Sequence, residues 1–232
     1  MLNTMIPLGS STMKLNSIYQ HENLLHTKLD LHPFQQPSQT QGYLELLQDL
    51  SKRLLEITQM DAITYQSLSG ASGEYVGLKT IQEYYKSKNE TQRNIMLMPR
   101  SAHGSNFATS GKMGLKICHI ELDQDGHIDL QDLKQKIKGK ENQIFGIMLT
   151  YPTTMGIFEE GTLQVVNEVK KCGAIVYVDG ANMNAQFMLT SPGFIGDVCH
   201  LNLHKSFAIP HGGGGPGMGP VLCKDYLSKF LP

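Results

Sequence analysis

From residue 43 onward, short apolar runs alternate with segments in which apolar residues recur at helical spacing, and this alternation constrains the fold more than any other feature. Strands are predicted over residues 94–98, 115–120, 143–150, 174–179, 198–201 and 220–223. Helices are predicted over residues 43–57, 73–88, 103–113, 129–137 and 162–171. This order indicates βαβ units and an α/β fold with a mostly parallel sheet covered by helices on both faces. Ligands of such sheets bind beyond the carboxyl ends of the strands, so the residues that follow each strand are the place to search for a site.

Residues 1–40 differ from the rest of the chain because they are polar, contain scattered proline, serine and glutamine, and show little periodicity. The backbone before Pro33 and Pro37 is expected to be extended or turned. We interpret residues 1–40 as an N-terminal extended arm and residues 41–232 as one large ligand-binding domain.

Charge and composition exclude several classes of protein. The formal net charge is −1 and no run of Lys and Arg with interleaved aromatic residues occurs, so nucleic acid is not an expected partner. No apolar stretch approaches the roughly 20 residues that span a bilayer, and no signal or transit segment is recognised in this chain. None of the four cysteines lies in a C-x-x-C pair, which favours reduced thiols in a reducing compartment.

Two predicted strand ends carry residues suited to chemistry. Asp179 follows an apolar strand and precedes small residues, so its carboxylate is placed to bind a cation or a protonated ring nitrogen. A helix cap, a turn or a magnesium ligand would explain this aspartate equally well. Lys205 follows the next apolar run, and a partly desolvated lysine becomes a usable nucleophile, although a surface lysine is an equal alternative. Together they suit a cofactor that needs a protonated pyridine nitrogen and a Schiff base.

Other segments give weaker signals. Residues 67–74 lead into a helix through small residues, which favours an anion site at the helix N-terminus but is as typical of an ordinary helix start. His103 opens another helix and is placed to stack on a flat ring, or else to cap the helix. The glycine-rich run at residues 209–220 indicates close approach of the backbone to a ligand or a neighbouring chain rather than a flexible linker.

Metal and hydrolase motifs are incomplete. Residues 123–126 resemble the start of an EF-hand loop, but the glycine comes too early and no glutamate follows at the required distance. His200 and His204 are four residues apart, yet they fall where a strand passes into a loop, so no zinc site is predicted. The sequence contains no G-x-S-x-G motif to anchor a hydrolase triad.

These motifs together closely resemble glycine dehydrogenase (decarboxylating), the P-protein family of the glycine cleavage system, in its half that binds pyridoxal 5'-phosphate (PLP). The matching stretches follow the family's order and cover residues 5–16, 69–75, 101–106, 150–156, 177–182 and 202–219. The last of them is highly specific, and together with residues 5–16 it argues against another fold type I enzyme, such as an aminotransferase or a sulfur-abstracting lyase.

The resemblance implies the large domain of PLP-dependent fold type I, similar to aspartate aminotransferase, with a mostly parallel seven-stranded sheet. It also implies a reaction in which glycine displaces Lys205 from the cofactor and loses CO₂, and the aminomethyl group passes to the lipoyl arm of H-protein. Lys205, His103 and Asp179 are the implied catalytic residues, with His103 and Ala181 on the two ring faces. The other implied cofactor or substrate contacts are Ser69, Gly70, Ala71, Ser72, His204, Asn106 and Thr154.

The sequence departs from the family's pattern at several points. Ser11 and Ala208 stand where members usually have cysteine, which puts redox control at those positions in doubt. The family's N-terminal half and its small C-terminal domain are not found in this chain, so a fragment is expected, and a non-catalytic assembly partner is the alternative function. A dimer of P-protein chains is expected by resemblance, in a mitochondrion for a eukaryotic source or in bacterial cytoplasm otherwise.

Overall fold

The computed structural model describes residues 18–26, 31–32, 34–207, 209 and 217–232. Seven strands form one sheet in the order β1-β7-β6-β5-β4-β2-β3. The strands are β1 (Ala62–Thr64), β2 (Ile95–Pro99), β3 (Lys116–Ile120), β4 (Ile144–Thr150), β5 (Ile175–Gly180), β6 (Val198–Leu201) and β7 (Val221–Cys223). Strands β3, β2, β4, β5 and β6 are parallel, whereas β7 runs antiparallel to both β6 and β1.

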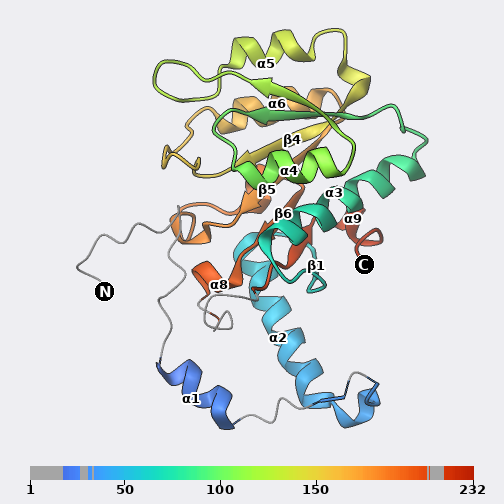
Figure 1. Ribbon diagram of the computed structural model, residues 1–232, viewed down its shortest axis with the longest axis vertical. Coiled ribbons are helices and arrows are strands. Elements are labelled where there is room, and N and C mark those ends of the chain that lie inside the picture. Colours follow the sequence, from blue (N-terminus) through green and yellow to red (C-terminus); the bar gives the residue numbers. More distant parts are fainter. Residues whose placement is uncertain (1–17, 27–30, 33, 208, 210–216) are drawn as a thin grey trace.

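Helices cover both faces of the sheet (Figure 1). They are α1 (Ile18–His26), α2 (Gln41–Thr58), α3 (Gly70–Ser87), α4 (Gly104–Lys112), α5 (Leu130–Ile137), α6 (Thr162–Lys171), α7 (Pro192–Ile195), α8 (Leu203–Ser206) and α9 (Asp225–Ser228). One apolar core joins α2, α5, α6 and α7 to one face, and a second core joins α3, α4 and α9 to the other. Because both faces are buried, the central strands are apolar throughout, which explains their continuous apolar runs.

The predicted α/β class, the mostly parallel sheet and the seven strands are confirmed. Strand β1 had no signal in the sequence because its three residues, Ala62–Thr64, are too few to show a period of two. Helix α3 begins at Gly70 rather than at residue 73, since Ser69 and Ser72 form a capping box that satisfies the first turn.

The expectation that residues 1–40 form an extended arm is wrong for residues 18–26. They form α1, which contains no proline and buries no side chain. Helix α2 projects from the sheet, and α1 lies apart from the sheet (Figure 1).

The domain boundary at residue 40 stays a prediction. Residues 5–16, Ser11 and Ala208 lie outside the described residues. Among the helices that the structure describes, none is long and apolar enough to cross a membrane.

The strand order places a topological switch point between β2 and β4. From β2 the chain proceeds to β3 on one side, and it then returns past β2 to β4, β5 and β6 on the other. At such a point the connections that follow two adjacent parallel strands leave in opposite directions. A crevice for ligands therefore opens beyond the carboxyl ends of these strands. The loops after β2, β4, β5 and β6 therefore meet in one place.

Candidate functional site

A cavity of about 260 Å³ lies at the carboxyl ends of β4, β5 and β6, beside the N-terminal ends of α3 and α4. Its lining includes eight of the residues predicted from the sequence: Gly70, Ala71, His103, Thr154, Asp179, Ala181, His204 and Lys205. A larger hollow, of about 630 Å³, lies at the other end of α3 beside Tyr84, Lys88 and Phe230. That hollow is lined by none of the predicted residues, so we place the site in the smaller cavity.

Asp179 lies near the end of β5, where it is buried and surrounded by donors. Its Oδ1 accepts from the backbone N–H of Ala181 (3.0 Å) and pairs with Nε2 of His200 (3.3 Å), and its Oδ2 accepts from Nδ2 of Asn106 (3.1 Å). A carboxylate offers about four lone-pair sites. Three of these sites are accounted for by Ala181, His200 and Asn106, and the carboxylate itself lines the cavity.

His200 is held between Tyr177 and Asp179. The hydroxyl of Tyr177 lies 2.8 Å from Nδ1 of His200, and burial raises the pKa of this phenol well above its ordinary value. The phenol therefore keeps its proton. A carboxylate facing a ring nitrogen accepts from it, so Nε2 of His200 is the third donor to Asp179, and Tyr177 holds the ring from its other nitrogen.

Lys205 lies in α8, one short turn beyond β6, and lines the same cavity as Asp179. Burial lowers the pKa of its ammonium group, and the negative charges of Asp179 and Glu74 oppose this effect without cancelling it. A lysine with a lowered pKa has a larger neutral fraction near pH 7, and the neutral amine is the nucleophilic form.

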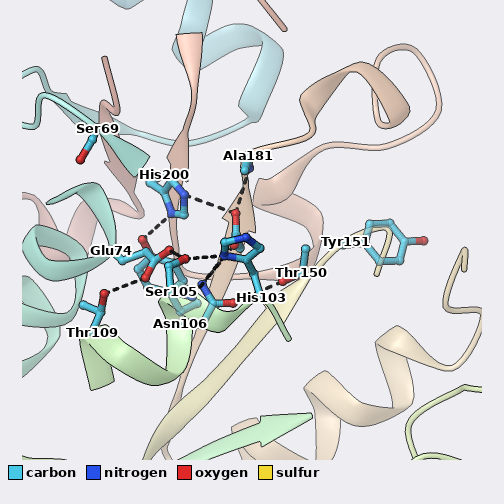
Figure 2. Close-up of polar contacts among 12 residues, drawn as sticks. Ser69, Glu74, His103, Ser105, Asn106, Thr109, Thr150, Tyr151, Ala181 and His200 are labelled. Carbon is cyan, nitrogen blue, oxygen red and sulfur yellow. Dashed lines mark hydrogen bonds and ion pairs between the residues drawn. The ribbon is translucent and has the colours of Figure 1, made fainter. Parts of the chain in front are cut away.

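His103 and Thr154 line the cavity from the loops that follow β2 and β4. His103 is the N-cap of α4, and its Nδ1 lies 2.6 Å from the hydroxyl of Ser105. Figure 2 shows His103, Ser105 and Glu74 joined by polar contacts. The Thr154 hydroxyl donates to the carbonyl oxygen of Ser101, which ties the loop after β4 to the loop after β2.

Three predicted residues do not line the cavity. The hydroxyls of Ser69 and Ser72 bond to each other and to backbone groups of the first turn of α3, so they cap the helix. Figure 2 shows Ser69 apart from the polar cluster. Asn106 is fully buried behind Asp179, where it donates to that carboxylate and accepts from Thr150 at 3.4 Å. Gly70 and Ala71, rather than the two serines, line the cavity at this helix start.

Two described glycines of the glycine-rich run allow close approach within the chain itself. A Cβ at Gly217 would lie 2.6 Å from Nδ1 of His204, and a Cβ at Gly219 would lie 2.1 Å from the carbonyl oxygen of Ser69. The Gly219 N–H also donates to the carbonyl oxygen of Ser67 (3.0 Å). These glycines thus pack the chain against α8 and the start of α3. Residues 210–216 of the run lie outside the described residues.

We expect Gly219→Ala to lower the free energy of unfolding by about 1–3 kcal/mol, because the added methyl group meets backbone that cannot move aside. The matched control is Gly111→Ala in α4, where nothing lies within 4 Å of the added Cβ. There we expect a gain of about 0.5–1 kcal/mol from helix propensity. Urea denaturation of the three proteins measures both changes, and equal midpoints for Gly219→Ala and wild type would contradict the close approach.

No site role is predicted from the sequence for Glu74, Ser105, His200 or Asn202, which the structure places in the lining of the cavity. One signal was available for Glu74: it lies four and seven residues before Leu78 and Ile81, on the buried stripe of α3. A carboxylate on such a stripe requires a buried partner. Asn202 packs against Gly70, where a Cβ would lie 2.5 Å from Oδ1 of Asn202, and this contact is visible only in the fold.

Comparison with known proteins identifies the family. A sequence model described as "Glycine cleavage system P-protein" matches residues 3–232. The chain belongs to the P-protein family. "Glycine dehydrogenase (decarboxylating)" of Vibrio campbellii is 51% identical over 230 residues, and the protein of the same name from Vibrio vulnificus is 52% identical over the same length. Each alignment covers 98% of this chain and 24% of the relative, so the chain spans about a quarter of the length of these P-proteins.

Solved structures agree on the fold. A glycine decarboxylase (P-protein) of the glycine cleavage system, in inhibitor-bound form, superposes with a TM-score of 0.78 at 19% identity, over 97% of this chain and 49% of that one. Ureidoglycine-glyoxylate aminotransferase from Bacillus subtilis gives 0.70 at 12% identity, over 99% and 55%. The chain therefore has the fold type I architecture predicted from the P-protein resemblance.

Proposed function

We propose that this chain binds PLP at Lys205 and supplies the cofactor-binding part of a P-protein that decarboxylates glycine. The observation that carries the proposal is the pairing of Asp179 and Lys205 in one cavity. Asp179 presents a carboxylate to the cavity, where a ring N–H could donate to it, and Lys205 is an amine whose pKa is lowered by burial. Membership of the family supports the same assignment.

The residues around the cavity fit PLP in its charge and shape. Gly70 and Ala71 line the cavity at the start of α3, where backbone N–H groups and the helix dipole would favour an anion such as the phosphate. His103 and Ala181 would contact the two faces of the ring, as the family resemblance implies. Asp179 would accept the hydrogen bond of the pyridinium nitrogen, and His204 and Thr154 would contact the phosphate or the substrate.

When bound, PLP supplies an electron sink that stabilises the carbanion left after loss of CO₂. The residues of this chain provide the setting for that chemistry. Asp179, which is oriented by three hydrogen-bonding neighbours, would pair with the protonated ring nitrogen. Lys205 would bind the cofactor as a neutral amine and, once glycine has displaced it, would remain beside the reacting carbon as a base.

For partners we propose glycine, the lipoyl arm of H-protein and further P-protein chain, because the relatives are named as glycine dehydrogenases of the decarboxylating type. These relatives are bacterial proteins, which favours a bacterial cytoplasm over a mitochondrion for the present chain. The alternative function is binding of the cofactor without catalysis.

Two measurements test the proposal. PLP is added to the purified chain, and its binding is followed by visible absorbance and by dialysis. Exchange of labelled CO₂ into the carboxyl group of glycine is then measured with lipoylated H-protein. PLP binding with glycine-dependent exchange supports the full proposal. Binding without exchange supports the non-catalytic alternative, and absence of PLP binding by a folded chain overturns both.

A further inference from the structure

Asn106 is a buried amide in the first turn of α4, and the family resemblance implies for it a direct contact with cofactor or substrate. Its side chain is fully buried and does not line the cavity. Its Nδ2 donates to Oδ2 of Asp179 (3.1 Å), and its Oδ1 accepts from the hydroxyl of Thr150 at 3.4 Å (Figure 2). Both of these neighbours line the cavity, so Asn106 acts on the cavity through them.

The two ends of the Asn106 amide have different partners, which fixes how the amide is turned. An amide nitrogen donates hydrogen bonds and an amide oxygen accepts them. Thr150 supplies a donor to the oxygen, and Asp179 supplies an acceptor for the nitrogen. Thr150 and Asp179 are paired in the register of β4 and β5, so the amide spans the carboxyl ends of two neighbouring strands. A buried amide needs such partners, because an unpaired polar group in the core costs free energy.

The carboxylate of Asp179 is held at both of its oxygens. Ala181 and His200 contact Oδ1, whereas Asn106 donates to Oδ2. The last torsion of an aspartate side chain is broad, so contacts at Oδ1 alone would let Oδ2 swing about the Cβ–Cγ bond. A donor at Oδ2 therefore fixes the plane of the carboxylate. A ring N–H in the cavity needs that plane, because hydrogen bonds to a carboxyl oxygen form near the plane of the group.

The start of α4 connects this contact to another part of the site. His103 is the N-cap of α4 and lines the cavity, and Asn106 follows it by three residues, about one helical turn. The backbone N–H of Asn106 donates to the carbonyl oxygen of His103 (3.0 Å). One end of one helix thus carries the ring expected to stack on the cofactor and the amide that orients the carboxylate expected at the cofactor's ring nitrogen.

We propose that Asn106 is a positioning residue that aims the carboxylate of Asp179 at the ring nitrogen of the cofactor. The inference rests on the proposed function, because the ring nitrogen is then the group that Asp179 meets. Asn106 itself touches neither cofactor nor substrate, in place of the direct contact that the resemblance implies. Its effect is therefore confined to ligands that carry a hydrogen-bond donor at the position of the ring nitrogen.

Crystal structures of the chain without cofactor test the positioning directly. Asn106→Leu keeps the approximate size of the side chain and removes the amide. In the wild type the Asp179 carboxylate should have one orientation, with Oδ2 toward residue 106. In Asn106→Leu the carboxylate should turn about the Cβ–Cγ bond or occupy two orientations, and an unchanged single orientation would overturn the proposal. If Asn106→Leu does not fold, Asn106→Ala, whose side chain is smaller than the one it replaces, takes its place.

Equilibrium titration with two ligands tests the consequence for the cofactor. One ligand is PLP, and the other is an analogue of PLP in which a CH group replaces the ring nitrogen. Asn106→Leu should weaken the binding of PLP by about 10-fold, the effect of losing one hydrogen bond to a charged group. Binding of the analogue should not change, because the analogue has no ring N–H for Asp179 to accept. Equal weakening of both ligands would indicate a merely structural role and would overturn the proposal, as would unchanged binding of PLP.

The control for lost stability is Tyr85→Phe. The hydroxyl of Tyr85 donates to the carbonyl oxygen of Phe145 (2.8 Å) and accepts from the backbone N–H of Ile175 (3.1 Å), at the amino ends of β4 and β5. Tyr85 does not line the cavity, so this variant should denature at a lower temperature and bind both ligands as the wild type does. If the wild type binds no PLP, the proposed function fails, and the crystal structures alone decide whether Asn106 orients Asp179.

Discussion

Replacing Lys205 with alanine is expected to abolish covalent attachment of PLP to the chain. Lys205 lines the cavity with Asp179, and burial lowers the pKa of its amine, so it is the lysine best placed to react with an aldehyde there. After borohydride reduction, peptide mass mapping of the wild type should find the PLP-modified lysine at residue 205. In Lys205→Ala the modification should be lost from the peptide and the visible absorbance should disappear.

The control is Lys229→Ala, which changes a lysine beside the larger hollow at the other end of α3 and should leave PLP attachment unchanged. Thermal denaturation verifies that each variant is folded. The rate of attachment in the wild type should rise with pH, because only the neutral amine reacts. Since burial lowers the pKa of Lys205, the rise should be complete at a lower pH than for an exposed lysine. Equal covalent modification of Lys205→Ala and wild type would disprove the assignment.

Asp179→Asn is expected to weaken PLP binding by about 100-fold or more. The substitution keeps the size of the side chain but removes the charge opposite the ring nitrogen, and breaking a buried ion pair costs about 3–5 kcal/mol. It also removes a charge that raises the pKa of Lys205, so that pKa should fall further. Equilibrium titration with PLP measures the affinity, and glycine–CO₂ exchange at saturating PLP measures any remaining turnover.

The matched control is Asp197→Asn, because Asp197 is another buried aspartate, directly before β6. It accepts from the backbone N–H of Val176 at 2.9 Å and pairs with Lys170 at 3.3 Å. It does not line the cavity. This variant should be less stable than the wild type but should retain its affinity for PLP. If both variants bind PLP as tightly as the wild type, Asp179 has no role as partner of the ring nitrogen.

Much of the candidate site was predictable because a parallel sheet gathers the ends of its strands. Asp179 and Lys205 were each found at the end of an apolar run, and in the fold they reach the same cavity. Family resemblance supplied His103, Ala181 and Thr154, which also line it. Ser69 and Ser72 line none of it, because a serine at a helix start can satisfy the helix's own N–H groups as readily as those of a ligand.

The periodicity of apolar residues determined the class of fold, the order of helices and strands and the edge of the sheet at which a ligand binds, since burial on both faces requires continuous apolar strands. Tertiary packing alone decided which side chains meet. Glu74, Ser105 and His103 come from α3, from α4 and from the residue that caps α4, and Tyr177 reaches His200 across two neighbouring strands. These contacts depend on helix placement and side-chain direction to within a fraction of an ångström, which no local pattern of residues encodes.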